Sequence, residues 1–133
     1  MTLVSIKPFG GDIRAGFIVE KKFSNSTIKQ EIYLECNSPV LKFKTDVDWH
    51  EQEVMLKVAF PVAVNSPQAC FDIQFGHIYR PTHRNTLLDI AKFEVPAHKW
   101  MDISEGNYGV SLLNDCKYGA DVENNVLRLT LLR

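Results

Sequence analysis

The sequence predicts an all-β fold, an antiparallel β-sandwich formed as one domain over residues 1–133. Three observations lead to this prediction. Apolar and polar residues alternate along several runs, turn-forming residues separate those runs, and helical periodicity is nearly absent. An alternation with a period of two places every second side chain on the same face of an extended strand. Several such strands joined by polar turns are typical of a β-sandwich.

Four runs show the alternation most clearly. In residues 26–36, Ile28, Ile32 and Leu34 point to one face, while Lys29 and Glu31 point to the other. The same pattern recurs in residues 54–60, 69–75 and 126–132. Turn-forming residues lie between the runs, at residues 10–11, 37–39, 65–67, 105–107 and 123–125. These positions are rich in Gly, Pro, Asn and Ser, which favour turns and not regular structure.

One segment has a competing interpretation. The stretch TLLDIAKFE, residues 86–94, is the nearest candidate for a helix and could form two helical turns. Val95 and Pro96 follow it, and the residue before a proline avoids the helical region of backbone space. Because predicted strands also surround this segment, we expect it to adopt β structure.

Composition and charge exclude several classes of protein. Hydrophobic residues make up 45% of the chain and the formal net charge is -1, so nothing indicates disorder or a nucleic-acid partner. The longest apolar run, residues 58–64, is too short to cross a bilayer, and the N-terminus lacks the pattern of a signal peptide. Three scattered cysteines without CxxC spacing indicate free thiols in a reducing compartment. We therefore expect a cytoplasmic protein with no membrane partner.

The stretch FDIQFGHIYRPTHRN, residues 71–85, has the density of bases and donors of a catalytic centre. His77 and His83 are six residues apart, however, and the chain contains no HxD, HExxH, paired-cysteine or GxSxG motif. In the alternative interpretation, Gly76 breaks a strand, residues 79–81 end it, and residues 82–85 form an exposed loop. A metal site assembled in space from distant histidines also remains open. Its candidate ligands are His50, His77, His83 and His98.

Several sequence blocks resemble one family of enzymes. They are DWHEQE (residues 48–53), LKVAFPV (56–62), FGHIYRPTHRNT (75–86), AKFEVPAHKWMDISEGNYGVSLLNDCKYG (91–119) and LRLTLLR (127–133). In order and spacing they resemble the C-terminal β region of family 38 glycoside hydrolases, the α-mannosidases. Residues 1–47 are similar to the preceding part of that region more loosely. One departure is that Leu87 and Leu88 stand where the family commonly has Ser-Trp after Asn-Thr.

The resemblance implies an accessory β-domain of a larger glycosidase that hydrolyses terminal α-mannosides of oligosaccharides with retention. The family holds zinc or another divalent metal through an HxD pair, an aspartate nucleophile and a later histidine, all of which precede this region. We therefore expect no catalytic residue and no bound metal within this chain, which alone should be inactive. Its implied partners are the catalytic and helical domains of the same polypeptide, and the parent's substrate is a mannose-containing oligosaccharide.

The resemblance also suggests site residues. Arg133 matches an arginine that lies close to the substrate in the family. We expect the loop residues His77, Arg80, His83 and Arg84 to rim the active site or to form an inter-domain interface. The chain ends in the last predicted strand without a polar tail, which is typical of a segment cut from a longer chain.

Two alternatives of other classes remain open at this point. The first is an independent carbohydrate-binding module that uses aromatic side chains as stacking platforms. Its platform residues would be Trp49, Tyr79, Trp100 and Tyr108. The second is a self-contained metal enzyme built on the four histidines. Coplanar and exposed Trp49 and Trp100 would favour the binding module.

Overall fold

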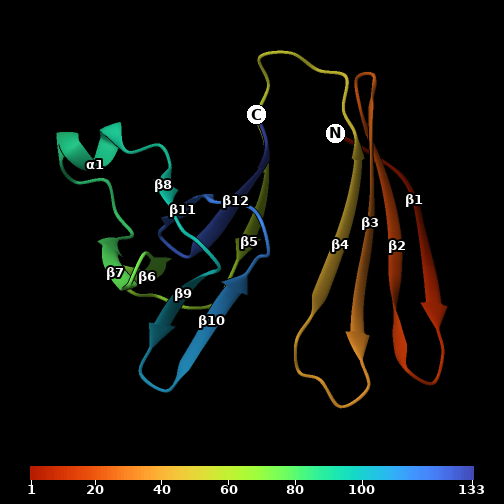
Figure 1. Cartoon of the computed structure of the whole chain (residues 1–133), viewed down its shortest axis with the longest axis horizontal. Helices are drawn as coiled ribbons and strands as arrows, with labels where there is room; N and C mark the ends of the chain where they lie inside the picture. The colour runs from red at the N-terminus through yellow and green to blue at the C-terminus, as the bar shows by residue number, and fades with distance from the viewer. The chain divides into compact units, whose positions relative to one another are not determined.

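The computed structural model describes all residues from 1 to 133, and it is all-β, with twelve strands and one helix of five residues (Figure 1). All strand pairs are antiparallel, so the predicted fold class is confirmed. The chain divides into two compact units, unit 1 (Met1–Glu53) and unit 2 (Val54–Arg133). The expectation of a single domain stays a prediction, because two compact units can still unfold together as one domain.

Unit 1 is one four-stranded meander in the order β1-β2-β3-β4 (Figure 1). Its strands are β1 (Thr2–Gly10), β2 (Arg14–Phe23), β3 (Ser26–Glu35) and β4 (Lys42–Asp48). The strand register places apolar residues opposite one another: Phe17 of β2 pairs with Pro8 of β1 and with Ile32 of β3. Because the side-chain period of a strand is two, this register places most apolar side chains on one face of the sheet and most charged side chains on the other.

The two faces of unit 1 differ sharply in chemistry. The charged face includes Arg14, whose guanidinium carbon lies 5.0 Å from the centre of the Tyr33 ring, and the ion pair between Lys42 and Glu35. On the apolar face, Val19 is buried, whereas the Phe17 side chain is 52% exposed. The apolar face includes Ile6, Phe17, Val19, Ile28, Ile32 and Leu34. A sheet with one apolar face requires a second layer over it.

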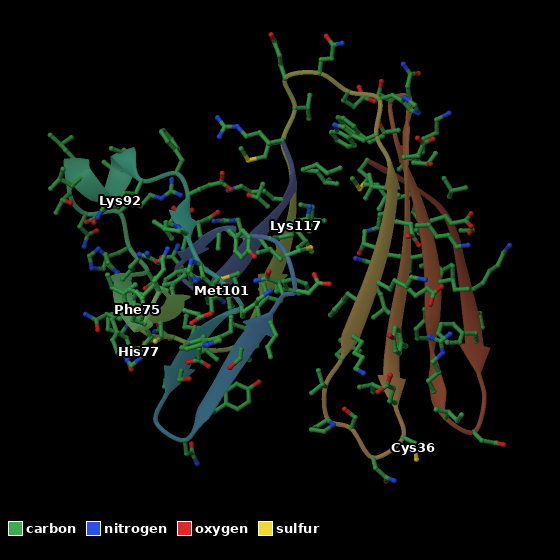
Figure 2. The ribbon with its side chains drawn as sticks, in the orientation of Figure 1. Cys36, Phe75, His77, Lys92, Met101 and Lys117 are labelled. Atoms are coloured by element: carbon green, nitrogen blue, oxygen red, sulfur yellow. The ribbon has the colours of Figure 1, made fainter.

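Unit 2 is a sandwich of two four-stranded sheets. One sheet has the order β10-β9-β6-β7, and the other has the order β5-β12-β11-β8. The strands are β5 (Leu56–Pro61), β6 (Gln68–Ile73), β7 (Gly76–Pro81), β8 (Val95–Pro96), β9 (Trp100–Glu105), β10 (Tyr108–Leu113), β11 (Gly119–Glu123) and β12 (Val126–Leu132). Phe71 and Met101 of the first sheet pack with Leu127 and Leu129 of the second to form the core, where Figure 2 labels Met101.

The expectation of β structure in residues 86–94 is wrong, because Leu87–Ala91 form the helix α1. Thr86 has an extended backbone, and its hydroxyl oxygen accepts a hydrogen bond from the backbone N–H of Asp89 at 3.1 Å. The same hydroxyl donates to the Asp89 carboxylate at 2.7 Å. This reciprocal pair caps the first helical turn and outweighs the proline that follows. No residue of α1 is buried, so the cap and not packing defines the helix.

An ion pair and a hydrogen bond fix Glu94, which lies three residues after α1. The Lys57 ammonium lies 3.0 Å from the Glu94 carboxylate and 2.8 Å from that of Asp121, and the Thr130 hydroxyl also donates to Glu94. Burial opposes ionisation of Glu94, but the hydrogen bonds from Thr130 and Lys57 outweigh it, so the pKa of this carboxyl lies below its usual value. Glu94 is therefore held as a carboxylate that ties the loop to β5 and β12.

We expect the isolated chain to self-associate through the apolar face of unit 1. Phe17→Lys places a charge at the centre of this face and should shift the chain toward monomer, as sedimentation velocity would measure over a concentration series. Thr27→Lys adds the same charge to the opposite, charged face and serves as the control. A wild-type chain that stays monomeric at millimolar concentration would contradict this expectation.

Glu94→Gln should reduce stability in a pH-dependent way. The folded-state pKa of Glu94 is depressed, so its contribution is present above the unfolded pKa of about 4.3 and is lost as pH falls through the folded value. At pH 7 the substitution should lower the free energy of unfolding by about 1–2 kcal/mol, since it removes a charge-assisted hydrogen bond. In urea titrations the difference from wild type should shrink below about pH 4. Glu53→Gln, at an exposed residue, is the control, and a difference independent of pH would refute the ion-pair role.

Candidate functional site

Strand β7 divides the polar cluster of residues 76–84 between two faces of a sheet. His77 and Tyr79 lie on the outer face, and Arg80 lies on the inner face, where it pairs with Ala69 of β6. The Arg80 guanidinium carbon is 4.7 Å from the centre of the buried Phe71 ring, and Nη1 donates to the Pro96 carbonyl oxygen at 3.1 Å. His77 and Arg80, only three residues apart, therefore serve different surfaces.

The loop after β7 is held in place by Thr82. Its hydroxyl donates to the Ser66 carbonyl oxygen at 2.6 Å, and its own carbonyl accepts from the backbone N–H of Asn124 at 2.7 Å. The expectation of an exposed loop over residues 82–85 is therefore wrong for Thr82, which is buried, and for Arg84, which is half-buried. The expectation that Gly76 breaks a strand is also wrong. Gly76 is the first residue of β7, and Phe75 in the preceding turn adopts a positive φ of 63°.

A cleft opens beside the edge strand β7, next to the segment 82–94. Apolar walls come from Phe71, Val95 and Val122. Its basic lining residues are Arg80, His83, Arg84 and Lys92. The cleft is therefore an apolar recess with a cationic rim, and three of the four predicted loop residues meet there.

The charges at this cleft are unequally satisfied. Burial lowers the pKa of Arg80, which has no ion-pair partner, whereas Nε of Arg84 lies 3.6 Å from a Glu123 carboxylate oxygen. The hydrogen bond from Thr86 lowers the pKa of Asp89, and the charges of Lys92 and His83 act in the same direction. The other carboxylate, Asp121, is bonded to Lys57 and Arg128 at 2.8 and 2.7 Å. The cleft can therefore bind carboxylates or hydroxyl groups through its cations, and its own two carboxylates already contact Thr86, Lys57 and Arg128.

The helix α1 exposes an unusual amount of apolar surface beside the cleft. Leu87 is 85% exposed, Leu88 is 75% exposed and Phe93 is 71% exposed. In Figure 2, Lys92 lies at the end of this helix, so a charge accompanies the apolar residues. Contiguous apolar residues rimmed by polar ones are typical of an interaction site. We call Leu87, Leu88, Ile90 and Phe93 the apolar lip.

The aromatic residues expected as stacking platforms are not all brought together. Trp49 lies in unit 1, where its ring centre is 6.1 Å from that of Phe23 in a stacked arrangement, and Tyr108 is the first residue of β10. In unit 2, by contrast, His77 contacts both Tyr79 and Trp100, with ring centres 5.5 and 6.5 Å apart. His77 is the residue that sequence reasoning missed for this role, since its place beside Trp100 depends on strands distant in sequence.

The remaining predicted residues lie apart from the cleft. Arg133 is exposed and follows the end of β12. His50 pairs with Asp48 at 2.9 Å, and the His98 ring packs against Tyr118 at 5.7 Å. Nowhere in the chain do three or more His, Cys, Asp or Glu side chains lie where they could hold a metal ion. The one helix is far too short to cross a bilayer.

Comparison with known proteins assigns this architecture. The model of the glycosyl hydrolases family 38 C-terminal domain matches residues 5–133. Alpha-mannosidase 2C1 of Homo sapiens is 55% identical over 109 residues, and its Mus musculus counterpart is 54% identical over the same length. Alpha-mannosidase G of Dictyostelium discoideum is 46% identical. Each alignment covers 82% of this chain but 10% of the relative, so the chain spans about one tenth of their length.

The family match extends over both units, and the relatives agree with it at high identity. The chain therefore belongs to glycosyl hydrolase family 38, the α-mannosidases, as part of their C-terminal domain.

Proposed function

We propose that this chain is the non-catalytic C-terminal β region of a cytoplasmic α-mannosidase that hydrolyses terminal α-mannosides of oligosaccharides with retention. In this proposal unit 2 packs on the catalytic domain, and the segment 82–94 rims its active site. The observation that carries the proposal is the conjunction of the cationic cleft and the apolar lip on one short segment. The three free cysteines favour the reducing cytoplasm.

The apolar lip supports a packing role. The exposure of Leu87, Leu88 and Phe93 to water is unfavourable. Burying them would stabilise an interface by about 25 cal/mol per Å² of apolar surface removed from water. No side chain of α1 packs into the core of unit 2, so these residues do not serve the fold. A surface of this type is what an inter-domain interface within one polypeptide requires.

The cleft supports the second part of the proposal, a position beside the active site. Guanidinium groups stay charged and offer several donors in a fixed plane, which suits sugar hydroxyls or a catalytic carboxylate. Arg80 provides such a group that no carboxylate of this chain neutralises. A carboxylate or hydroxyl from the catalytic domain would therefore complete the cleft.

The catalytic residues themselves belong elsewhere in the polypeptide. A retaining glycosidase needs two carboxyl groups about 5–5.5 Å apart, one as nucleophile and one as acid and base. Both carboxylates at the cleft are engaged in the contacts described above. No group of three or more His, Cys, Asp or Glu side chains in this chain is placed to hold the zinc that the resemblance implies. In this proposal the zinc ligands belong to the catalytic domain of the full-length polypeptide.

The isolated 133-residue chain should not hydrolyse an aryl α-mannoside, with or without added zinc, because the nucleophile and metal-ligand motifs that the resemblance implies are not in its sequence. The full-length protein, assayed under the same conditions, is the positive control. Release of the aryl group by the isolated chain above the buffer rate would overturn the non-catalytic role.

Arg133→Ala in the full-length enzyme should lower kcat/KM by about ten- to a hundred-fold, as expected for loss of a charged hydrogen bond of roughly 1.5–3 kcal/mol to the substrate or a catalytic carboxylate. The melting temperature should hardly change, because Arg133 is exposed and adds little packing. Arg84→Ala, at the cleft, provides the comparison. If kcat/KM of Arg133→Ala stays within about two-fold of wild type, Arg133 does not reach the substrate.

A further inference from the structure

The outer face of the sheet β10-β9-β6-β7 forms a surface distinct from the cleft. The strand register aligns Ser111, Asp102, Cys70 and Tyr79 in one row across all four strands. A neighbouring row contains Trp100 and the pair Asp72–His77. Because the register fixes which residues share a face, His77, Tyr79, Trp100 and Asp102 all point away from the core. We call these four residues the ring-and-carboxylate face.

The centre of this face is small and polar. One Asp102 oxygen accepts a hydrogen bond from the Ser104 hydroxyl at 2.6 Å, and the other accepts from the Ser111 hydroxyl at 2.7 Å. A methyl group at Gly109 would lie 2.1 Å from the Ser104 hydroxyl oxygen, so only glycine leaves room for this serine. Each carboxylate oxygen has a further lone pair, which remains available to a ligand hydroxyl. Asp102 is thus a preorganised acceptor at the floor of the face.

Aromatic rings border this floor on one side. The Tyr79 ring is 61% exposed and meets the His77 ring edge to face, at an interplanar angle of 88°. The Trp100 ring is tilted by 40° relative to that of His77. Because the His77 ring contacts the rings of both Tyr79 and Trp100, the orientations of all three rings are restricted before any ligand binds. Rigid, partly exposed rings beside a fixed carboxylate offer both an apolar surface and a directional acceptor.

Charge on this face separates it from the cleft. The twelve outward positions of the four strands include two carboxylates, Asp72 and Asp102, and no lysine or arginine. An anionic ligand would be repelled here, and no set of side chains is suited to a metal ion. In Figure 2, His77 lies beside β7, away from Lys92 on the segment that follows it. The face therefore fits a neutral ligand rich in hydroxyl groups.

We propose that the ring-and-carboxylate face binds a neutral hexopyranose unit of an oligosaccharide, outside any catalytic site. The apolar C–H surface of the sugar packs on Tyr79 and Trp100, and two neighbouring hydroxyls donate to Asp102. Binding here would hold a branched oligosaccharide to the protein without reaction. The proposal does not depend on the segment 82–94 rimming an active site, since that segment lies at the cleft.

The direct test is a titration of the 133-residue chain with methyl α-D-mannopyranoside, followed by amide and indole N–H chemical shifts. Saturable shifts of the Trp100 indole N–H are expected, with a Kd of about 1–10 mM, as for a small ligand on an open face. Tyr79→Ala and Asp102→Asn should each weaken binding at least about ten-fold. Tyr108→Ala is the matched control, because Tyr108 is 56% exposed but lies outside the face. A Trp100 indole signal that does not move at sugar concentrations well above this Kd, or equal weakening by Tyr108→Ala, would overturn the proposal.

A second measurement uses the full-length protein and keeps the test independent of how the isolated chain behaves. Electrophoresis through a gel containing mannan should retard wild type and Tyr108→Ala, while Tyr79→Ala migrates faster than both. Hydrolysis of a small aryl α-mannoside should be the same for all three proteins. If wild type does not hydrolyse the aryl α-mannoside, the proposed function alone is contradicted. If Tyr79→Ala and wild type migrate equally, the proposal of sugar binding at the ring-and-carboxylate face is refuted.

Discussion

The packing of Phe71 and Met101 against Leu127 between two sheets is the interaction on which the rest of unit 2 depends. Phe71 and Met101 are direct partners on neighbouring strands, so burying them fixes the register of β6 against β9. A slip of β9 by one residue would turn Asp102 inward and Met101 outward, which the cost of burying the Asp102 charge forbids. The same constraint places Arg80 at the cleft and His77 on the opposite face. Both candidate surfaces are thus consequences of one core.

The segment 82–94 beside the cleft does not depend on the core for its conformation. Thr82 fixes the start of the segment through backbone contacts, and Glu94 ties its end to Lys57 and Thr130. Between these anchors the Thr86–Asp89 cap and backbone hydrogen bonds order the helix, and its apolar residues remain on the surface. A segment held at both ends but uncovered in the middle is suited to complete its packing against another part of the same polypeptide.

Much of the fold could be predicted from alternation, and the misses have specific causes. Ser26–Glu35 and Val126–Leu132 follow the expected strands closely, because their apolar residues keep a period of two. Strand β2 was not recognised, since Lys21 lies on the apolar side and Ile18 on the charged side, which blurs the pattern. The helix was missed although Thr86 and Asp89 stand at the spacing of an N-cap. Local cap chemistry there outweighed the strands around it.

The candidate surfaces were harder to predict than the strands. Alternation along β7 would have separated His77 from Arg80, but only the pairing of β7, β6 and β9 reveals that His77 meets Trp100. Similarly, the contact of Asp102 with Ser111 depends on the register of the β9–β10 hairpin. Sequence spacing therefore identified residue types suited to sugar contacts, while their grouping depended on contacts distant in the chain.

Hydrogen–deuterium exchange, compared between the full-length protein and the 133-residue chain, tests most directly whether this region packs on a catalytic domain through the segment 82–94. If it does, the backbone amides of residues 87–93 exchange quickly in the isolated chain and are strongly protected in the full-length protein, while amides in the core strands β6 and β9 change little. Equally fast exchange of residues 87–93 in both proteins would contradict this and leave the apolar lip exposed to solvent in the complete enzyme.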